Sequence, residues 1–130
     1  MKLIFMSSVV ALSVLLTGCQ SKQDKALAKF RSICREIESA IDTLDGKGAS
    51  DGYHRLADAR KEIDDQKLEA EEKSSIELIM LGGQEFELNV MSYRLSEVGG
   101  EYSNTDAQMA EYDLKEWKRF LHEYLRKYDK

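Results

Sequence analysis

Apolar residues recur at helical spacing in four segments of the chain, which are separated by short polar or glycine-containing stretches. The expected helices span about 24–44, 50–65, 69–98 and 104–128. Proline is absent, so nothing in the composition interrupts long helices. Because short connections between amphipathic helices favour antiparallel neighbours, the pattern predicts an all-α fold, an antiparallel four-helix bundle.

The first two helices differ in the width of their apolar stripes. Residues 45–48 (Asp-Gly-Lys-Gly) are expected to end the first helix, and Ser50 is expected to cap the second, which has the thinner stripe. Cys34 lies within the stripe of the first helix and is expected to be a buried, inert thiol. The alternative is an intermolecular disulfide or a redox role, since the neighbouring Arg35 could favour the thiolate. The stripe of the first helix consists of Leu27, Phe30, Ile33, Cys34, Ile37, Ala40, Ile41 and Leu44.

The third helix is the most apolar part of the chain after residue 20, and its apolar residues spread around much of its circumference. This pattern predicts the central, most buried helix of the bundle. Gly82 and Gly83 interrupt it, either because a neighbouring helix approaches closely or because the segment breaks into two helices. In the fourth helix, aromatic residues such as Trp117 and Tyr124 are expected in the core; the alternative is an aromatic and cationic interaction surface.

The first residues of the chain have the layout of a secretory signal peptide. Lys2 is followed by an uncharged run from Leu3 to Leu16, of about 14 residues, whereas a bilayer-spanning helix needs about 20. Leu16-Thr17-Gly18-Cys19 resembles the lipobox of bacterial lipoproteins. The resemblance implies cleavage before Cys19, a diacylglycerol thioether on its sulfur and acylation of the new amino terminus. An uncleaved signal anchor is the alternative, and the shortness of the run argues against it.

This resemblance divides the chain into residues 1–18 as signal peptide, 19–23 as lipidated cysteine and short polar tether, and 24–130 as helical domain. Gln20, rather than aspartate, follows the cysteine, and in enteric-type bacteria the lipoprotein family usually reads this as release to the outer membrane. The inner membrane is the alternative. An extended tether over 20–23 would reach about 15 Å, so the domain is expected close to the membrane surface.

Charge and motifs exclude several classes of function. The chain has 19 basic and 24 acidic residues and a net charge of −5, which argues against a nucleic-acid partner. The acidic run over 62–72 lacks the pattern of a calcium loop and is expected to be solvated surface. The only histidines, His54 and His122, belong to no metal or nucleophile motif, and no CxxC, GxSxG or nucleotide-binding loop is present. We therefore expect no metal, no cofactor and no catalytic activity.

Three functional hypotheses follow. The preferred one is a lipid-anchored, non-catalytic protein that binds a protein partner at the periplasmic face of the outer membrane; in size and layout the chain is similar to small helical lipoproteins that pilot secretin subunits. The second is an immunity or exclusion lipoprotein, whose acidic surface would suit a basic toxin. The third is a carrier of small apolar ligands in a cavity beside the glycine pair. For a partner protein, the expected binding residues are Glu69, Glu71 and Glu72.

Overall fold

The computed structural model describes the backbone of residues 2–43, 45–98 and 104–129, and the side chains of residues 22–43, 45–89 and 111–129. This part of the chain contains no β-strand. The expected all-α fold is confirmed. The helices are α1 (Lys2–Asp42), α2 (Gly46–Lys61), a short 3-10 helix η1 (Asp65–Lys67), α3 (Ala70–Val98) and α4 (Asn104–Tyr128).

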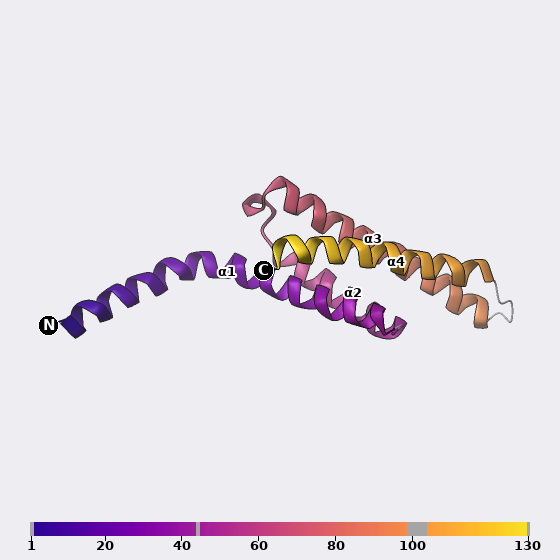
Figure 1. Ribbon diagram of the computed structural model, residues 1–130, viewed down its shortest axis with the longest axis horizontal. Coiled ribbons are helices and arrows are strands. Elements are labelled where there is room, and N and C mark those ends of the chain that lie inside the picture. Colours follow the sequence, from indigo (N-terminus) through magenta and orange to yellow (C-terminus); the bar gives the residue numbers. More distant parts are fainter. Residues whose placement is uncertain (1, 44, 99–103, 130) are drawn as a thin grey trace.

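The four helices form two antiparallel hairpins that pack against each other (Figure 1). In the first hairpin, Arg55 of α2 pairs with Glu36 of α1 at 2.6 Å, and Lys29 pairs with Glu62 beyond the end of α2 at 3.4 Å. In the second hairpin, α3 and α4 contact each other along their described length, and α4 also packs on α1. The structure therefore supports the predicted antiparallel four-helix bundle.

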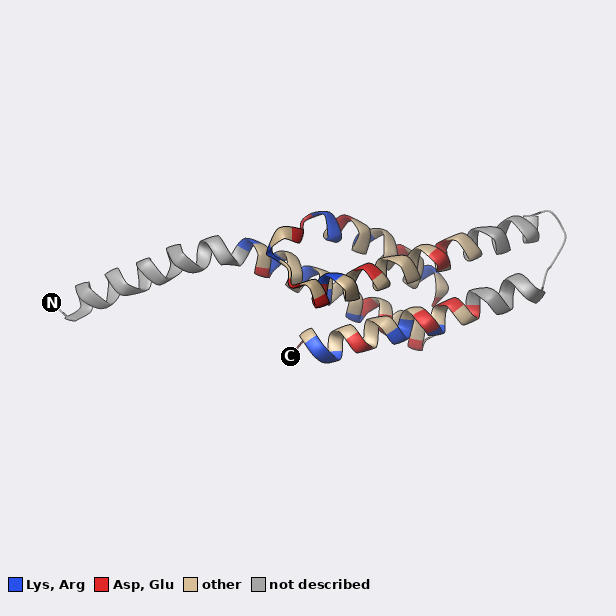
Figure 2. Cartoon of the chain, turned by 90° about the horizontal axis from the view of Figure 1, so that it is seen from above, with Lys and Arg blue, Asp and Glu red and all other residues tan. Residues whose placement is uncertain are grey.

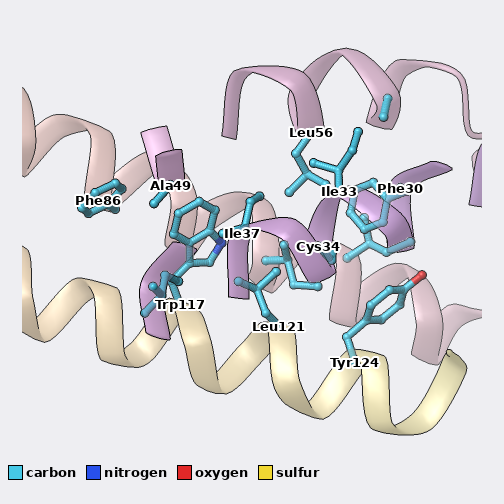
Figure 3. Packing of buried hydrophobic residues seen from close by; sticks show 14 of the residues in the cluster. Phe30, Ile33, Cys34, Ile37, Ala49, Leu56, Phe86, Trp117, Leu121 and Tyr124 are labelled. Carbon is cyan, nitrogen blue, oxygen red and sulfur yellow. The ribbon is translucent and has the colours of Figure 1, made fainter. Parts of the chain in front are cut away.

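Aromatic and aliphatic side chains from all four helices form one core (Figure 3). Phe30 and Tyr124 meet edge to face at 5.9 Å between ring centroids, and Phe86 stacks on Trp117 at 5.6 Å. Most of the expected stripe of the first helix is buried here, and so are the expected core aromatics Trp117 and Tyr124 of the fourth helix. Of the other stripe residues, Leu27 and Ala40 are partly buried, and Leu44 lies outside the described residues. The fully buried side chains include Phe30, Cys34, Ile37, Leu56, Ile76, Ile79, Phe86, Trp117 and Leu121.

Gly82 and Gly83 do not break α3, which is continuous through them. A β-carbon on Gly82 would lie 3.1 Å from Cδ1 of Trp117, and one on Gly83 would lie 2.4 Å from Cδ2 of Tyr53. The glycines therefore allow α2 and α4 to approach α3 closely. Of the two interpretations of the pair, close approach is correct and a break into two helices is wrong.

The start of α2 differs from the prediction. Asp45, not Ser50, is the N-cap, and its Oδ1 accepts a hydrogen bond from the backbone N–H of Gly48 at 2.9 Å. Ser50 lies inside α2 and is buried. The expectation that residues 45–48 end the first helix is also wrong, because Gly46 and Gly48 already belong to α2. Asp45 precedes Ser50 in the chain, and its side chain accepts a bond from one of the backbone N–H groups that follow it. The helix therefore begins at the aspartate rather than at the serine.

The beginning of α1 and the end of α2 also differ from expectation. The expected tether residues 20–23 belong to α1, which is helical from Lys2 to Asp42. Four residues in a helix rise only about 6 Å, less than half their extended reach. Gln23 is bonded twice to the segment after α2: its Nε2 donates to the carbonyl of Asp64 at 3.1 Å, and its Oε1 accepts from the N–H of Asp64 at 2.9 Å. The α2 helix ends at Lys61, before the expected Asp65.

Candidate functional site

The acids predicted to bind a partner lie at the start of α3, in three different environments. Glu69 is exposed and precedes the helix, and its carbonyl accepts a hydrogen bond from the N–H of Lys73 at 3.0 Å. Glu71 is exposed and forms an ion pair with Lys127 of α4. Glu72 is only 8% exposed. The three residues therefore do not form one surface.

Glu72 belongs to a polar network that joins α1, α3 and α4. Its Oε2 accepts hydrogen bonds from Nη2 of Arg31 at 2.9 Å and from the hydroxyl of Tyr124 at 2.8 Å. Nε of Arg31 also donates to the Tyr124 oxygen at 3.3 Å. Glu72 therefore joins three helices of the bundle, and little of it is open to a partner. Partner binding by Glu69, Glu71 and Glu72 stays a prediction, and Glu72 is the least accessible of the three.

The network and its burial shift the pKa values of Arg31 and Tyr124. Burial raises the pKa of the Tyr124 phenol, and the hydrogen bond to Glu72 acts in the same direction. Burial alone would lower the pKa of the Arg31 guanidinium, but hydrogen bonds to Tyr124 and Glu72 outweigh it and raise that pKa. Arg31 stays charged and Tyr124 stays neutral, so the arginine balances the Glu72 carboxylate inside the bundle.

A shallow groove of about 220 Å³ runs between α3 and α4 on the outside of the bundle. It is open to solvent and begins beside the pair formed by Glu71 and Lys127, at the exposed end of the acidic segment. Leu78 of α3 and Phe120 of α4 give it an apolar part. The groove therefore connects the expected acidic surface to an apolar one. Its lining residues are Glu71, Ser75, Leu78, Phe120, Glu123, Tyr124, Arg126 and Lys127.

Three leucines of α3 point away from the core. Leu78 is 45% exposed, Leu81 52% and Leu88 59%. The buried positions of the same helix, which include Ile76, Ile79 and Phe86, precede them by two residues, or about 200° around the helix axis. The prediction that the third helix is the most buried one is therefore wrong for its described residues, because it has two apolar faces and only one is covered. We call Leu78, Leu81 and Leu88 the outer α3 stripe.

Acidic residues lie on the same face as the outer α3 stripe. Glu77 and Glu85 are exposed; Glu85 falls within the arc that the leucines occupy, and Glu77 lies at its edge, about 20° beyond Leu88. Neither forms an ion pair with another described residue, whereas Glu71, Glu72 and Glu87 of the same helix all have a basic or histidine partner. On the described helices as a whole, acidic and basic residues are interspersed (Figure 2). The stripe is therefore an apolar surface of local negative charge.

Cys34 and the two histidines lie in different environments. Cys34 is fully buried, and burial raises the pKa of its thiol, so it is a core residue as expected. That burial also removes it from any intermolecular disulfide in the folded bundle. His54 lies 3.5 Å from Glu87 and His122 lies 3.7 Å from Glu38. Over the side chains that the structure describes, no group of His, Cys, Asp and Glu has the arrangement of a metal site.

A second groove, of about 320 Å³, lies where α1 passes the end of α2. Charges of both signs line it, and the hydrogen bonds between Gln23 and Asp64 cross this region. This groove therefore belongs to the contact between α1 and the segment after α2. It is lined by Lys22, Gln23, Lys61, Glu62, Ile63, Asp64 and Lys67.

No helix within the described residues is both long and apolar enough to cross a bilayer.

Comparison of the chain with known protein families, with characterised proteins and with solved structures gives no match. The features on which a function can be argued are therefore those of the chain itself. They are the lipobox-like segment that ends at Cys19, the outer α3 stripe with its acids, and the groove that joins the stripe to Glu71.

Sequence reasoning missed the outer α3 stripe and the burial of Glu72 for different reasons. The stripe has a signal in the sequence: Ile76, Ile79 and Phe86 repeat two residues out of phase with Leu78, Leu81 and Leu88. Two such sets predict two apolar faces rather than one buried helix. The burial of Glu72 has no local signal, because its partners lie 41 and 52 residues away in the sequence.

Proposed function

We propose that the chain is a lipid-anchored, non-catalytic helical protein that binds a protein partner at the outer membrane, in the manner of a pilotin or adaptor. The single observation that carries the binding part is the outer α3 stripe, whose leucines are half exposed on a bundle that already has a closed core. Exposed apolar surface of this kind typically marks an interaction site. The lipobox-like Leu16-Thr17-Gly18-Cys19 supports the anchor.

The two alternative functions, a ligand carrier and an immunity protein, agree to different degrees with the positions of the side chains. The space beside Gly82 and Gly83, which suggested a cavity for an apolar ligand, is filled by Tyr53, Trp117 and Phe120. The ligand-carrier hypothesis thus loses the feature on which it rested. The immunity hypothesis rested on the acidic run over 62–72, whose acids other than Glu72 are exposed and would suit a basic toxin. The exposed Glu77 and Glu85 beside the stripe would add to that negative surface. An adaptor and an immunity protein would use the same surface and differ in the partner and in their need for the lipid.

The test is a crosslinking pull-down from membranes of the native host. It compares the natural chain with Cys19→Ala and with a Leu81→Gln/Leu88→Gln double variant, and Asp58→Asn on the exposed side of α2 serves as the matched surface control. We expect one dominant envelope partner, which is lost with Cys19→Ala, reduced with the leucine variant and unchanged with Asp58→Asn. A secreted toxin captured equally well without the lipid would favour immunity. Absence of any protein partner would contradict the proposal.

A further inference from the structure

We propose that the outer α3 stripe binds an amphipathic helix of the partner protein, and that lysine or arginine residues flank the apolar side of that helix. This inference rests on the proposed function, because it names the kind of segment that the partner inserts. The leucines of the stripe argue for the helical shape of the segment, and Glu77 and Glu85 argue for its positive charge.

The spacing of the leucines argues for a helical segment. Leu78, Leu81 and Leu88 lie on one face of α3, and the ten steps from the first to the last rise about 15 Å along the helix axis. A partner helix laid along this face would present apolar residues at the matching spacings of three, four and seven. The groove beside Leu78, with Phe120 as its other apolar wall, would take one of its side chains.

The acids beside the leucines argue for a basic partner. Glu85 lies within the apolar arc and Glu77 lies at its edge, so a helix that covers the stripe would bring its flanking residues close to both carboxylates. Without a cation opposite them, two carboxylates would lose water on binding and gain nothing in exchange. Lysine or arginine at the flanks would pair with them, as Lys127 already does with the neighbouring Glu71.

The same acids disfavour other occupants. Two copies of the chain that packed stripe against stripe about a twofold axis would bring the acids of one copy against those of the other. An anionic membrane surface would be repelled in the same way. A basic helix is the occupant for which both the leucines and the carboxylates gain favourable contacts.

The experiment uses the full chain, expressed in its host, with a photoreactive amino acid in place of Leu81. The same amino acid in place of Asp58, on the exposed side of α2, is the matched control. Crosslinked peptides are identified by mass spectrometry. We expect the Leu81 probe to capture a segment of another protein with apolar residues at helical spacing and at least two flanking lysines or arginines. The Asp58 probe should not capture this segment.

Charge reversal tests the electrostatic part separately. Glu77→Lys together with Glu85→Lys should reduce the yield of the Leu81 crosslink about tenfold and should weaken its dependence on salt. Glu111→Lys with Asp58→Lys, at exposed positions of α4 and α2, makes the same change in net charge and should leave the yield within about twofold. Thermal unfolding of both variants confirms that the bundle is intact.

Each other outcome overturns the inference, and the outcomes differ in what they say of the proposed function. Capture of an acidic, uncharged or extended segment of another protein would end the inference and leave partner binding standing. An unchanged yield after charge reversal would do the same. Crosslinks only to a second copy of the chain or to lipid, or no crosslink at all, would contradict both.

Discussion

The two faces of α3 are built from the same kinds of residue and lie in opposite environments. Ile76, Ile79 and Phe86 are at most 1% exposed, whereas Leu78, Leu81 and Leu88 are 45–59% exposed. Both sets come from the same stretch of the helix, residues 76–88. The number of apolar residues in a helix therefore does not tell how deeply the helix is buried. The positions of these residues around the helix axis show whether they form one face or two.

The largest expected effect separates the two faces directly. Ile79→Ala should lower the free energy of unfolding by about 2–5 kcal/mol, because it leaves a cavity in a filled core. Leu81→Ala, on the outer α3 stripe, should change it by less than about 0.5 kcal/mol. Urea denaturation followed by circular dichroism measures both. If the two variants were equally unstable, the outer stripe would be covered in the protein in solution, and the comparison would fail.

The acids at the start of α3 allow a second comparison between inside and outside. Glu72→Gln should cost about 1.5–3 kcal/mol, since it removes the charged acceptor of Arg31 and Tyr124 in a largely buried place. Glu71→Gln removes an exposed ion pair and should leave the stability nearly unchanged. The measurement is the denaturation midpoint of each variant. A small loss for Glu72→Gln would mean that the network is open to water.

Gly83 and Gly46 allow a comparison between a position where side chains crowd an added β-carbon and one where nothing does. In Gly83→Ala, the new β-carbon would overlap the rings of Tyr53 and Trp117, and we expect a net loss of about 1–2 kcal/mol although alanine favours the helix. Gly46→Ala is the control, because nothing lies within 4 Å of a β-carbon there. It should stabilise by about 0.4–1 kcal/mol. A stabilising Gly83→Ala, read from thermal melts, would contradict the close approach of α2 to α3.

The smallest expected effect concerns alkaline pH and the closed interior. Burial raises the pKa of Cys34 above its ordinary value of 9.0, so the folded state holds the neutral thiol while the unfolded chain ionises. This contribution to stability is complete below pH 9 and is lost as the pH rises further, at up to about 1.4 kcal/mol per pH unit. Between pH 8 and 9.5 this loss amounts to about 0.8 kcal/mol, so the free energy of unfolding should fall less steeply over that range for Cys34→Ala. Equal slopes would show that the thiol is already accessible.

Much of the fold follows from local pattern, and the departures come from contacts between distant residues. The bounds of α4 and the burial of Phe30, Ile37 and Trp117 follow from helical spacing alone. The cap at Asp45 was missed because an aspartate and a serine offer the same local signal. The role of Gly82 and Gly83 depends on which helices face them, and that is a property of the assembled bundle.

The candidate site was less predictable than the fold. Glu69 and Glu71 are exposed as their sequence suggests, but the partner of Glu72 is Arg31, from another helix. A local acidic run cannot show which of its members the fold places inside. The outer leucines were visible in the sequence, yet they are exposed because none of the other described helices covers that face.

The helical course of residues 20–23 and the bonds between Gln23 and Asp64 have a consequence for encounter rates. If Cys19 carries lipid, a helical rather than a flexible connection joins the domain to the membrane. The domain is then held at a nearly constant distance from the membrane surface, because a helix hardly changes its length. Partners that display their segment at that height would meet the outer α3 stripe at a high effective concentration, and partners elsewhere would hardly meet it. Insertion of a flexible glycine-serine segment after Gln20 would then slow capture without altering any contact.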